Sequence, residues 1–230
     1  MILDARDVSK SFDSLKAIPS CTFSVDEGKI VGLIGPNGAG KTTLFNLITG
    51  FLPLDRGQIF FKGENISGLK PHIIARKGIG RTFQISRIFQ KMTLLENLIL
   101  PSRTGKSKER ALELLEMAGL PDLREEYASD LSFGQQKILS IIQVFMLDPA
   151  LILLDEPAAG INPTMRNKII TFIHRLNEMG KTFLIIEHDM DVIMGHCDKI
   201  IVLCFGEKIA EGTSDEIRNN EAVLKAYFGK

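Results

Sequence analysis

The apolar positions near the start of the chain follow two different patterns. ILDARDVSKSF and AIPSCTFSVDEG are short, alternate partly between apolar and polar residues, and are bounded by turn residues. Such segments are typical of strands with one buried face, and they predict antiparallel strands. KIVGLIG is continuously apolar instead, which indicates a strand that is buried on both faces.

Three more continuous apolar runs follow in the second half of the chain. They are LILLD (151–155), TFLIIEHD (182–189) and KIIVLCFG (199–206), and segments with helical spacing separate them. Buried strands that alternate with helices are typical of a parallel sheet covered by helices. We therefore predict an α/β fold with a mostly parallel central sheet and an antiparallel β part formed by the first strands.

The segment 85–147 has a helical character throughout. FGQQKILSIIQVFML has the spacing of a helix, and so has KSKERALELLEMAGL, in which four small or apolar residues share one face with charges opposite: Ala111, Leu114, Leu115 and Ala118. We expect a single domain over residues 1–230. Its catalytic core is predicted at 1–84 and 148–230, and a helical lobe is inserted between these parts.

The stretch GPNGAGKTT joins KIVGLIG to a helical segment, TTLFNLITG, that is predicted to end near Gly50. It matches the pattern G-x-x-x-x-G-K-[ST] in the strand and helix context that a phosphate loop requires. Glycines let backbone N–H groups curl around phosphate oxygens, and the helix amino terminus adds partial positive charge. We predict nucleotide contacts from the whole loop: Gly35, Pro36, Asn37, Gly38, Ala39, Gly40, Lys41, Thr42 and Thr43.

Two loop residues have specific predicted roles in binding ATP and Mg²⁺. Lys41 is expected to neutralise the β and γ phosphates, and the Thr42 hydroxyl is expected to help hold the metal ion. The alternative is a glycine-rich turn with a surface lysine, which the flanking strand and helix disfavour.

The second part of the predicted site follows the run LILLD. Ligands of open α/β sheets bind at the carboxyl ends of strands, so Asp155 is predicted to reach Mg²⁺. Glu156 comes next and can polarise a water for attack on the γ phosphate, although the acidic pair could also cap the following helix. His188 ends another apolar run and could contact the γ phosphate or orient Glu156, while a lone histidine is more often structural.

Two further residues are weaker candidates. Gln84 in GRTFQ could bind Mg²⁺ or its water and move with the helical lobe, but taken alone it could equally be a surface residue. Phe12 in KSFDSL could stack on adenine, although an isolated phenylalanine more often belongs to the core.

Composition limits the partners and the compartment. Lysine plus arginine and aspartate plus glutamate number 28 each, so no overall charge draws the chain to nucleic acid, and none is expected as a partner. The three cysteines have neither zinc-site spacing nor an even count for disulfides, which indicates a reducing, cytoplasmic compartment. No signal peptide or membrane-spanning run is recognised in the sequence.

The stretch LSFGQQ (131–136) adds a signal that phosphate binding alone does not explain. By itself it predicts a helix amino terminus with Ser132 as the N-cap. Together with GPNGAGKTT, LILLDEP, AAGINP and EHD, in this order, it closely resembles the ATP-binding subunit of ABC transporters over essentially the whole chain. The resemblance implies a P-loop NTPase core of the ABC ATPase type, with the antiparallel and helical subdomains described above.

The resemblance also implies partners. In that family two subunits pack head to tail, so the chain is expected to pair with a second copy or a homologue and to act with transmembrane permease subunits. Carried over to this chain, Ser132, Gly134 and Gln135 would touch the γ phosphate held by the partner. AAGINP corresponds to the loop that crosses the interface, with Asn162 where many members have aspartate.

Several further sequence stretches look like those of the ATPases of branched-chain amino acid importers, including GIGRTFQ, MTLLENL, EPAAGINP and the ending EIRNNEAVLKAYFG. That likeness implies an extracytoplasmic substrate-binding protein in the complex and a peripheral position on the cytoplasmic face of the inner membrane. Two features depart from it: the segment before LSFGQQ is short, and Gln143 stands where arginine is common. The departures leave a urea, amide or other amino acid substrate open.

Three other classes of function are alternatives. A soluble ABC-type ATPase without a transport role is an alternative, but the long coiled coils and second cassette of several such proteins are absent from the sequence. A nucleotide-responsive binding subunit with little turnover is another. A GTPase or small-molecule kinase explains neither LSFGQQ nor His188, and no N-K-x-D motif occurs.

Overall fold

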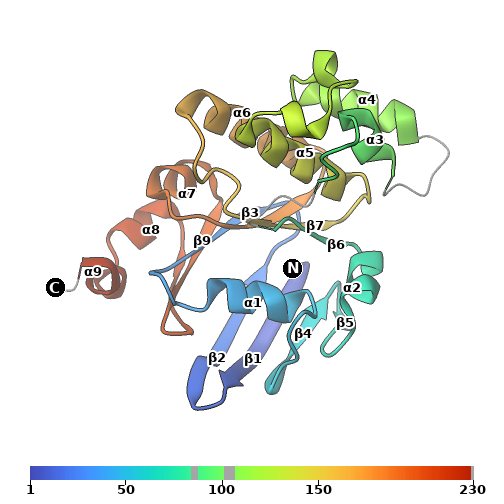
Figure 1. Ribbon diagram of the computed structural model, residues 1–230. Coiled ribbons are helices and arrows are strands. Elements are labelled where there is room, and N and C mark those ends of the chain that lie inside the picture. The colour runs from blue at the N-terminus through green and yellow to red at the C-terminus, as the bar shows by residue number, and fades with distance from the viewer. Residues whose placement is uncertain (84–87, 101–106, 229–230) are drawn as a thin grey trace.

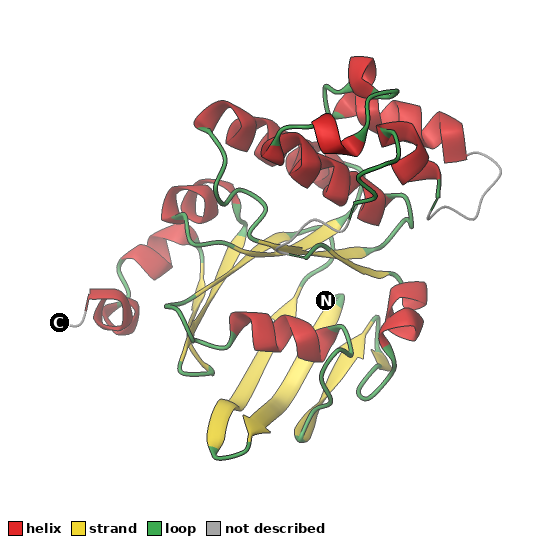
Figure 2. Ribbon diagram, viewed as in Figure 1, coloured by secondary structure: helices red, strands yellow, loops and turns green. Residues whose placement is uncertain are grey.

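The computed structural model describes residues 1–83, 88–100 and 107–228, which form two sheets with helices around them (Figures 1 and 2). The four-stranded sheet has the order β2-β1-β4-β5, and the six-stranded sheet has the order β10-β9-β3-β8-β7-β6. Helix α1 lies between the two sheets, and the helices α3 to α6 lie on the other side of the six-stranded sheet (Figure 1). This arrangement confirms the predicted α/β class.

The four-stranded sheet is antiparallel throughout. Strand β1 (Leu3–Phe12) pairs with β2 (Leu15–Val25) and β4 (Arg56–Phe61), and β4 pairs with the short β5 (Glu64–Asn65). The antiparallel pairing predicted for the first two segments is therefore confirmed. Irregularities in the β1–β2 register, which turn the strand locally, fall between positions 5 and 11.

The six-stranded sheet carries the residues of interest at the carboxyl ends of its parallel strands. These strands are β3 (Ile30–Ile34), β6 (Ile79–Arg81), β7 (Leu151–Asp155), β8 (Thr182–Ile186) and β9 (Lys199–Cys204). All residues of β3, β7 and β8 are buried, as their continuous apolar runs predict. Strand β10 (Glu207–Gly212) is antiparallel to β9, and it was not predicted.

One predicted strand is shorter in the structure. Strand β8 ends at Ile186, so the whole EHD stretch lies beyond it and helix α7 (Met190–His196) begins directly afterwards. Asp189 caps that helix by accepting hydrogen bonds from the amides of Asp191 and Val192. The polar stretch thus forms the connection between a buried strand and a helix, which is where side chains of an α/β sheet reach a ligand.

Helix α1 (Lys41–Ile48) joins the two sheets through its apolar residues. Leu44, Phe45 and Ile48 are fully buried in one core with residues of both sheets. Gly50, two residues past the last helical residue, has a φ of 72°, which suits glycine after a helix end. The remaining core helices are α2 (Pro71–Lys77), α6 (Pro163–Glu178), α8 (Ser214–Arg218) and α9 (Glu221–Phe228).

The segment 85–147 contains α3 (Leu94–Ile99), α4 (Ser107–Met117) and α5 (Phe133–Phe145) among its described residues. The predicted apolar face of α4 is buried against its neighbours, and these helices share a core with the outer face of the six-stranded sheet. The boundaries of this lobe as a unit stay a prediction. Across the described ranges, no helix is both long and apolar enough to cross a membrane.

Candidate nucleotide-binding site

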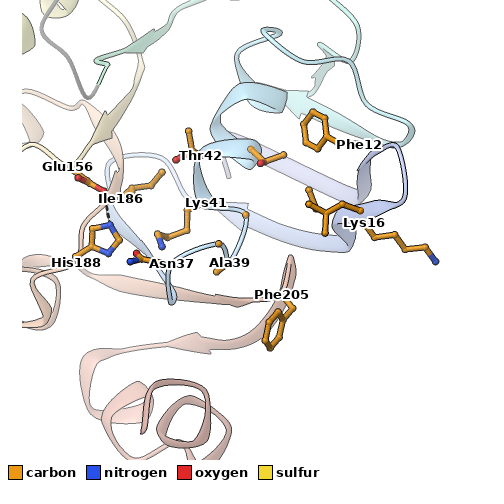
Figure 3. Close-up of a pocket in the computed structure, with 15 residues that line it drawn as sticks. Phe12, Lys16, Asn37, Ala39, Lys41, Thr42, Glu156, Ile186, His188 and Phe205 are labelled. Carbon is orange, nitrogen blue, oxygen red and sulfur yellow. Dashed lines mark hydrogen bonds and ion pairs between the residues drawn. The ribbon is translucent and has the colours of Figure 1, made fainter. Parts of the chain in front are cut away.

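A cavity of about 430 Å³ lies beside the glycine-rich loop (Figure 3). The structure brings most of the predicted residues together in its wall, namely Phe12, Asn37, Gly38, Ala39, Gly40, Lys41, Thr42, Thr43, Glu156 and His188. Other lining residues were not predicted: Leu15, Lys16, Ala17, Ile186 and Phe205. The wall combines elements from both sheets, because β1 and β2 supply one side and the ends of β7, β8 and β9 supply the other.

The loop is shaped by close packing as well as by its need for phosphate contacts. Gly40, directly before the first residue of α1, has a φ of 95°, and a Cβ there would lie 2.6 Å from the Cδ1 atom of Ile18. A Cβ on Gly35 would collide with the carbonyl oxygen of Leu203. Glycine is therefore required at both ends of the motif, and the loop runs into the amino terminus of α1, where backbone N–H groups favour an anion.

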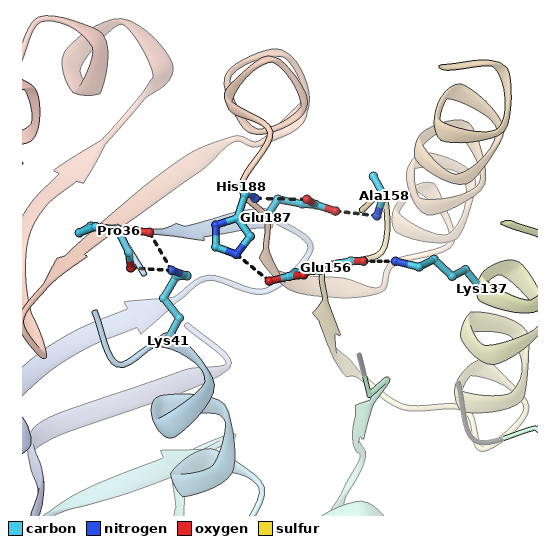
Figure 4. A network of polar contacts seen from close by, with 8 residues as sticks. Pro36, Lys41, Lys137, Glu156, Ala158, Glu187 and His188 are labelled. Carbon is cyan, nitrogen blue, oxygen red and sulfur yellow. Dashed lines mark hydrogen bonds and ion pairs between the residues drawn. The ribbon is translucent and has the colours of Figure 1, made fainter. Parts of the chain in front are cut away.

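Lys41 is held by the loop from which it extends. Its Nζ atom donates hydrogen bonds to the carbonyl oxygens of Gly35, at 2.7 Å, and Pro36, at 3.0 Å (Figure 4). Burial lowers the pKa of this ammonium group, and the carboxylates of Glu156 and Asp155 oppose the change. The Lys41 ammonium has lost part of its hydration and lies beside the backbone N–H groups of the loop. Phosphate oxygens can take the place of the lost water, so this position is suited to binding a phosphate.

Glu156 and His188 meet beyond the carboxyl ends of the neighbouring strands β7 and β8. In the parallel pairing of β7 with β8, Asp155 lies opposite Ile186, so the residues that follow the two strands emerge side by side. A carboxylate oxygen of Glu156 lies 2.6 Å from Nε2 of His188 (Figures 3 and 4). Glu156 also has a φ of 52°, which is uncommon outside glycine and often marks a functional position.

Asp155, at the end of β7, contacts a residue that sequence reasoning missed. Its carboxylate lies 3.2 Å from the guanidinium of Arg81, and the side chains are 7% and 6% exposed. Arg81 also donates to Asn46 of α1 and to Thr49, which directly follows that helix. Burial raises the pKa of Asp155, and the Arg81 charge opposes part of the rise. The only signal in the sequence was an arginine in GRTFQ, at the end of a short apolar segment.

Two exposed aromatic side chains flank the cavity. Phe12, at the end of β1, is 41% exposed and lies on one side of the loop, and Phe205, between β9 and β10, is 83% exposed and lies on the other (Figure 3). Phe205 has a φ of 47°, an unusual value for a bulky residue. Phe205 could have been found from the sequence as an aromatic residue just past a buried strand, next to Gly206.

The predicted residues of LSFGQQ do not line this cavity. Ser132 caps α5 as predicted and forms a capping box, in which its hydroxyl accepts from the Gln135 amide and the Gln135 side chain accepts from the Ser132 amide. A Cβ on Gly134 would collide with the side chain of Met165 in α6, so glycine is needed here for helix packing. Gln84, the remaining predicted residue, lies outside the described residues.

Asn162 and Gln143, the two residues that differ from the usual pattern of the resembling family, both form side-chain hydrogen bonds. Asn162 caps α6 by accepting a hydrogen bond from the Met165 amide at 2.9 Å, so the acidic pair Asp155–Glu156 is not the cap of that helix. Gln143 of α5 donates to the side-chain oxygen of Asn97 at 3.1 Å, and Asn97, a residue of α3, is fully buried. An amide therefore ties these two helices together where an arginine is common.

Two family models match this chain. The ABC transporter family matches residues 18–159, and a family described as branched-chain amino acid ATP-binding cassette transporter matches residues 207–230. A probable branched-chain amino acid transport ATP-binding protein, LivG, of Archaeoglobus fulgidus is 39% identical over 99% of this chain and 95% of its own length. The high-affinity branched-chain amino acid transport ATP-binding protein BraF of Pseudomonas aeruginosa is 39% identical over 100% and 98%.

Solved structures agree with these relatives. A cassette of an ABC transporter in its ADP conformation is 33% identical, with a TM-score of 0.92 over 100% of this chain and 99% of that chain. A dimeric cassette bound to ADP and Pi is 27% identical, with a TM-score of 0.83 over 93% of this chain and 99% of that one. The resemblance recognised through LSFGQQ and the ordered motifs is confirmed. The chain belongs to the ATP-binding subunits of ABC transporters and resembles, within that family, the subunits of branched-chain amino acid transport.

Proposed function

We propose that this chain binds and hydrolyses ATP to drive an importer of branched-chain amino acids. The observation that carries the hydrolytic part is the contact between Glu156 and His188 at the mouth of the loop cavity. A carboxylate and an imidazole in direct contact, facing a phosphate-binding loop, are suited to activating a water molecule. The transported substrate is inferred from the names of the relatives and from the match at residues 207–230.

In this proposal the glycine-rich loop holds the phosphates and Phe12 holds the base. The amides of the loop and the ammonium of Lys41 bind the β and γ phosphates, as the helix amino terminus and the two carbonyl contacts of Lys41 favour. Phe12 supplies a face on which adenine can stack, and its exposure at the cavity wall supports this role.

The residues near the γ phosphate also suit a hard cation. Thr42 at the start of α1 and Asp155 at the end of β7 offer hydroxyl and carboxylate oxygens, which are the donors that Mg²⁺ prefers. Gln84 is proposed as a further ligand. When bound, the metal ion would neutralise charge on the phosphates. The protein's own part is to hold those oxygens, and Arg81 orients the Asp155 carboxylate from behind.

Hydrolysis would begin with Glu156. Its carboxylate accepts a proton from water as the water oxygen bonds to the γ phosphorus, the bond to the β–γ bridging oxygen breaks, and ADP leaves. His188 holds the carboxylate in place through the 2.6 Å contact. The unusual backbone conformation of Glu156 directs the side chain toward the cavity instead of along the strand.

A second copy or a homologue would complete each site. Ser132, Gly134 and Gln135 lie on α5 outside the wall of the cavity in their own chain, which supports a role toward a partner's ATP. The dimeric cassettes among the solved structures support such a pairing. Permease subunits, a substrate-binding protein and a position on the cytoplasmic face of the inner membrane complete the proposed assembly.

The proposal is tested by assaying the purified chain and its native complex. We expect ATP hydrolysis that GTP does not outcompete, and stimulation when permease subunits co-purified with the chain are present. A ligand screen on the associated binding protein should then select leucine, isoleucine or valine. A complex whose binding protein selects urea, an amide or a polar amino acid would overturn the substrate and retain the ATPase.

A further inference from the structure

Two buried charged residues outside the predicted site lie directly behind Glu156. Lys137 of α5 is 8% exposed, and Glu187, which precedes His188, is 2% exposed. Charged side chains are rarely buried to this degree unless they are paired or hydrogen-bonded. Each of them contacts the backbone of the site (Figure 4).

Glu187 holds two parts of the site with its two carboxylate oxygens. One oxygen accepts a hydrogen bond from the amide of Ala158 at 2.6 Å, and the other accepts from the amide of His188 at 3.2 Å. Burial raises the pKa of this carboxyl, and the two amides together with the Lys137 charge oppose the rise. The segment that follows Glu156 and the segment that carries His188 are thereby fastened to one group.

Lys137 fastens the helix of LSFGQQ to the same place. Its Nζ atom donates to the carbonyl oxygen of Glu156 at 2.5 Å, and the carboxylates of Glu187, Glu156 and Asp155 favour its charge. Burial lowers the pKa of Lys137. The ammonium also lies 5.2 Å from the centre of the Phe133 ring, the residue at the start of α5.

The start of α5 packs closely on the AAGINP segment as well. The Phe133 ring would lie 3.6 Å from a Cβ at Gly160, and Gly134 meets Met165 so closely that no side chain fits between them. The two parts of the chain that would face a partner's ATP therefore form one packed unit. Lys137 connects this unit to the backbone of the residue that would hydrolyse the chain's own ATP.

We propose that Lys137 and Glu187 are positioning residues that link Glu156 and His188 in one site to the LSFGQQ helix and the AAGINP loop that serve the other. This inference rests on the proposed function, because it requires two sites completed by two chains. When ATP held by the partner binds the amino terminus of α5 and shifts this helix, Lys137 transmits the shift to the carbonyl group of Glu156. The Ala158 and His188 amides follow through Glu187. Lys137 and Glu187 hold backbone groups only two residues apart, the Glu156 carbonyl and the Ala158 amide, and their charges attract each other, so the two substitutions should not act independently.

The test is a double-mutant cycle of Lys137→Met and Glu187→Gln in the native complex, with the exposed Lys168→Met of α6 as the matched control. Each single variant should lower kcat by about tenfold or more and bring the Hill coefficient for ATP close to 1. ATP affinity should stay within about twofold, because neither residue lines the cavity. The double variant should lose less than the product of the two single losses, since it buries no unpaired charge.

Wild-type kcat and Hill coefficient in both single variants, or losses that multiply in the double variant, would overturn the inference. If Lys137→Met does not fold, Lys137→Arg keeps the charge and changes the donor geometry. It should lower the Hill coefficient at a near-normal thermal midpoint, and an unchanged coefficient would overturn the link. A Glu156→Gln chain that forms no dimer with ATP would overturn the proposed function and the inference with it. If that dimer forms but Lys137→Met and Glu187→Gln keep the wild-type Hill coefficient, the inference alone is overturned.

Discussion

The Nε2 atom of His188 lies 2.6 Å from a carboxylate oxygen of Glu156, and the two residues follow neighbouring parallel strands. The contact does not depend on a flexible loop, because the Glu156 amide donates to the carbonyl oxygen of Ile186 at 2.9 Å, continuing the pairing beyond the strand end. A group that must abstract a proton benefits from being held in one place before the reaction.

Glu156→Gln should separate binding from turnover. Glutamine has a similar shape but cannot accept a proton from water, so kcat should fall by about 10²-fold or more while ATP binding is retained. The measurements are steady-state phosphate release and equilibrium ATP binding, with size-exclusion chromatography to detect an ATP-bound dimer. His188→Ala, which leaves the carboxylate in place but unheld, is the companion variant and should lose activity with little change in affinity. Near-normal turnover of Glu156→Gln would remove this residue from the proposed role.

Arg81→Met should destabilise the fold by leaving Asp155 buried without its partner. Removing one member of a buried pair typically costs about 3–5 kcal/mol of unfolding free energy. Denaturant unfolding followed by circular dichroism measures the loss. Arg81→Met combined with Asp155→Asn should cost less than the sum of the two single changes, because both charges are then gone. Additive losses would mean that the 3.2 Å contact contributes no coupling.

Phe12→Ala should weaken ATP binding by about five- to fifteenfold, which corresponds to the loss of one stacking contact of about 1–1.5 kcal/mol. The effect should be nearly the same for ATP and ADP, because the ring would contact the base. Phe205→Ala is the matched control, since Phe205 lines the same cavity from the opposite side. A larger loss for Phe205→Ala than for Phe12→Ala, measured by titration with nucleotide, would move the base to the other side of the loop.

The thiol of Cys197 should resist alkylation in the folded chain at pH 9. Burial raises its pKa from 9.0 to about 12, so only about one thousandth of it is thiolate at that pH, compared with about half in the unfolded chain. Iodoacetamide labelling read by mass spectrometry should be at least 100-fold slower in the folded protein than in urea. Cys197 is a half-buried residue, and comparable labelling of the folded and unfolded chains would contradict the raised pKa of its thiol.

The same shift predicts how stability changes with pH. The unfolded chain releases the Cys197 proton near pH 9, whereas the folded chain keeps it until about 12, so this group's contribution is complete below pH 9 and is lost as pH rises toward 12. Cys197→Ala should therefore flatten the decline of the unfolding free energy between pH 9 and 11. An unchanged slope would assign the decline to other groups.

Local sequence patterns predicted the fold and the loop well. The continuous runs of β3, β7, β8 and β9 and the amphipathic face of α4 could be recognised because burial imposes a strict pattern on strands and helices. Strand β10 could not, since EKIAEG is half exposed and its apolar residues are few. Its existence depends on the partner strand β9.

Long-range contacts of charged side chains were the main part that sequence could not supply. The sequence assigned no role to Arg81, Lys137 or Glu187, because the approach of distant strands and helices that buries them leaves no periodic pattern. Phe205 was missed for a related reason, since its position at the cavity depends on the turn between β9 and β10. The roles of Ser132, Gly134, Gln135 and Gln84 stay predictions.

The pairing of Asp155 with Ile186 has a consequence for how this family can change. One residue added to or removed from β7 or β8 would turn every later side chain to the opposite face of the sheet, and Glu156 and His188 would part while the core lost its apolar contacts. Strands β7 and β8 can therefore accept single substitutions during evolution, but not the insertion or deletion of a residue. The segment between ENLIL and LSFGQQ is already shorter than is usual for the larger ATPase subunit of the importers that the sequence resembles. Insertions and deletions should therefore accumulate outside β7 and β8, leaving the spacing between Glu156 and His188 intact.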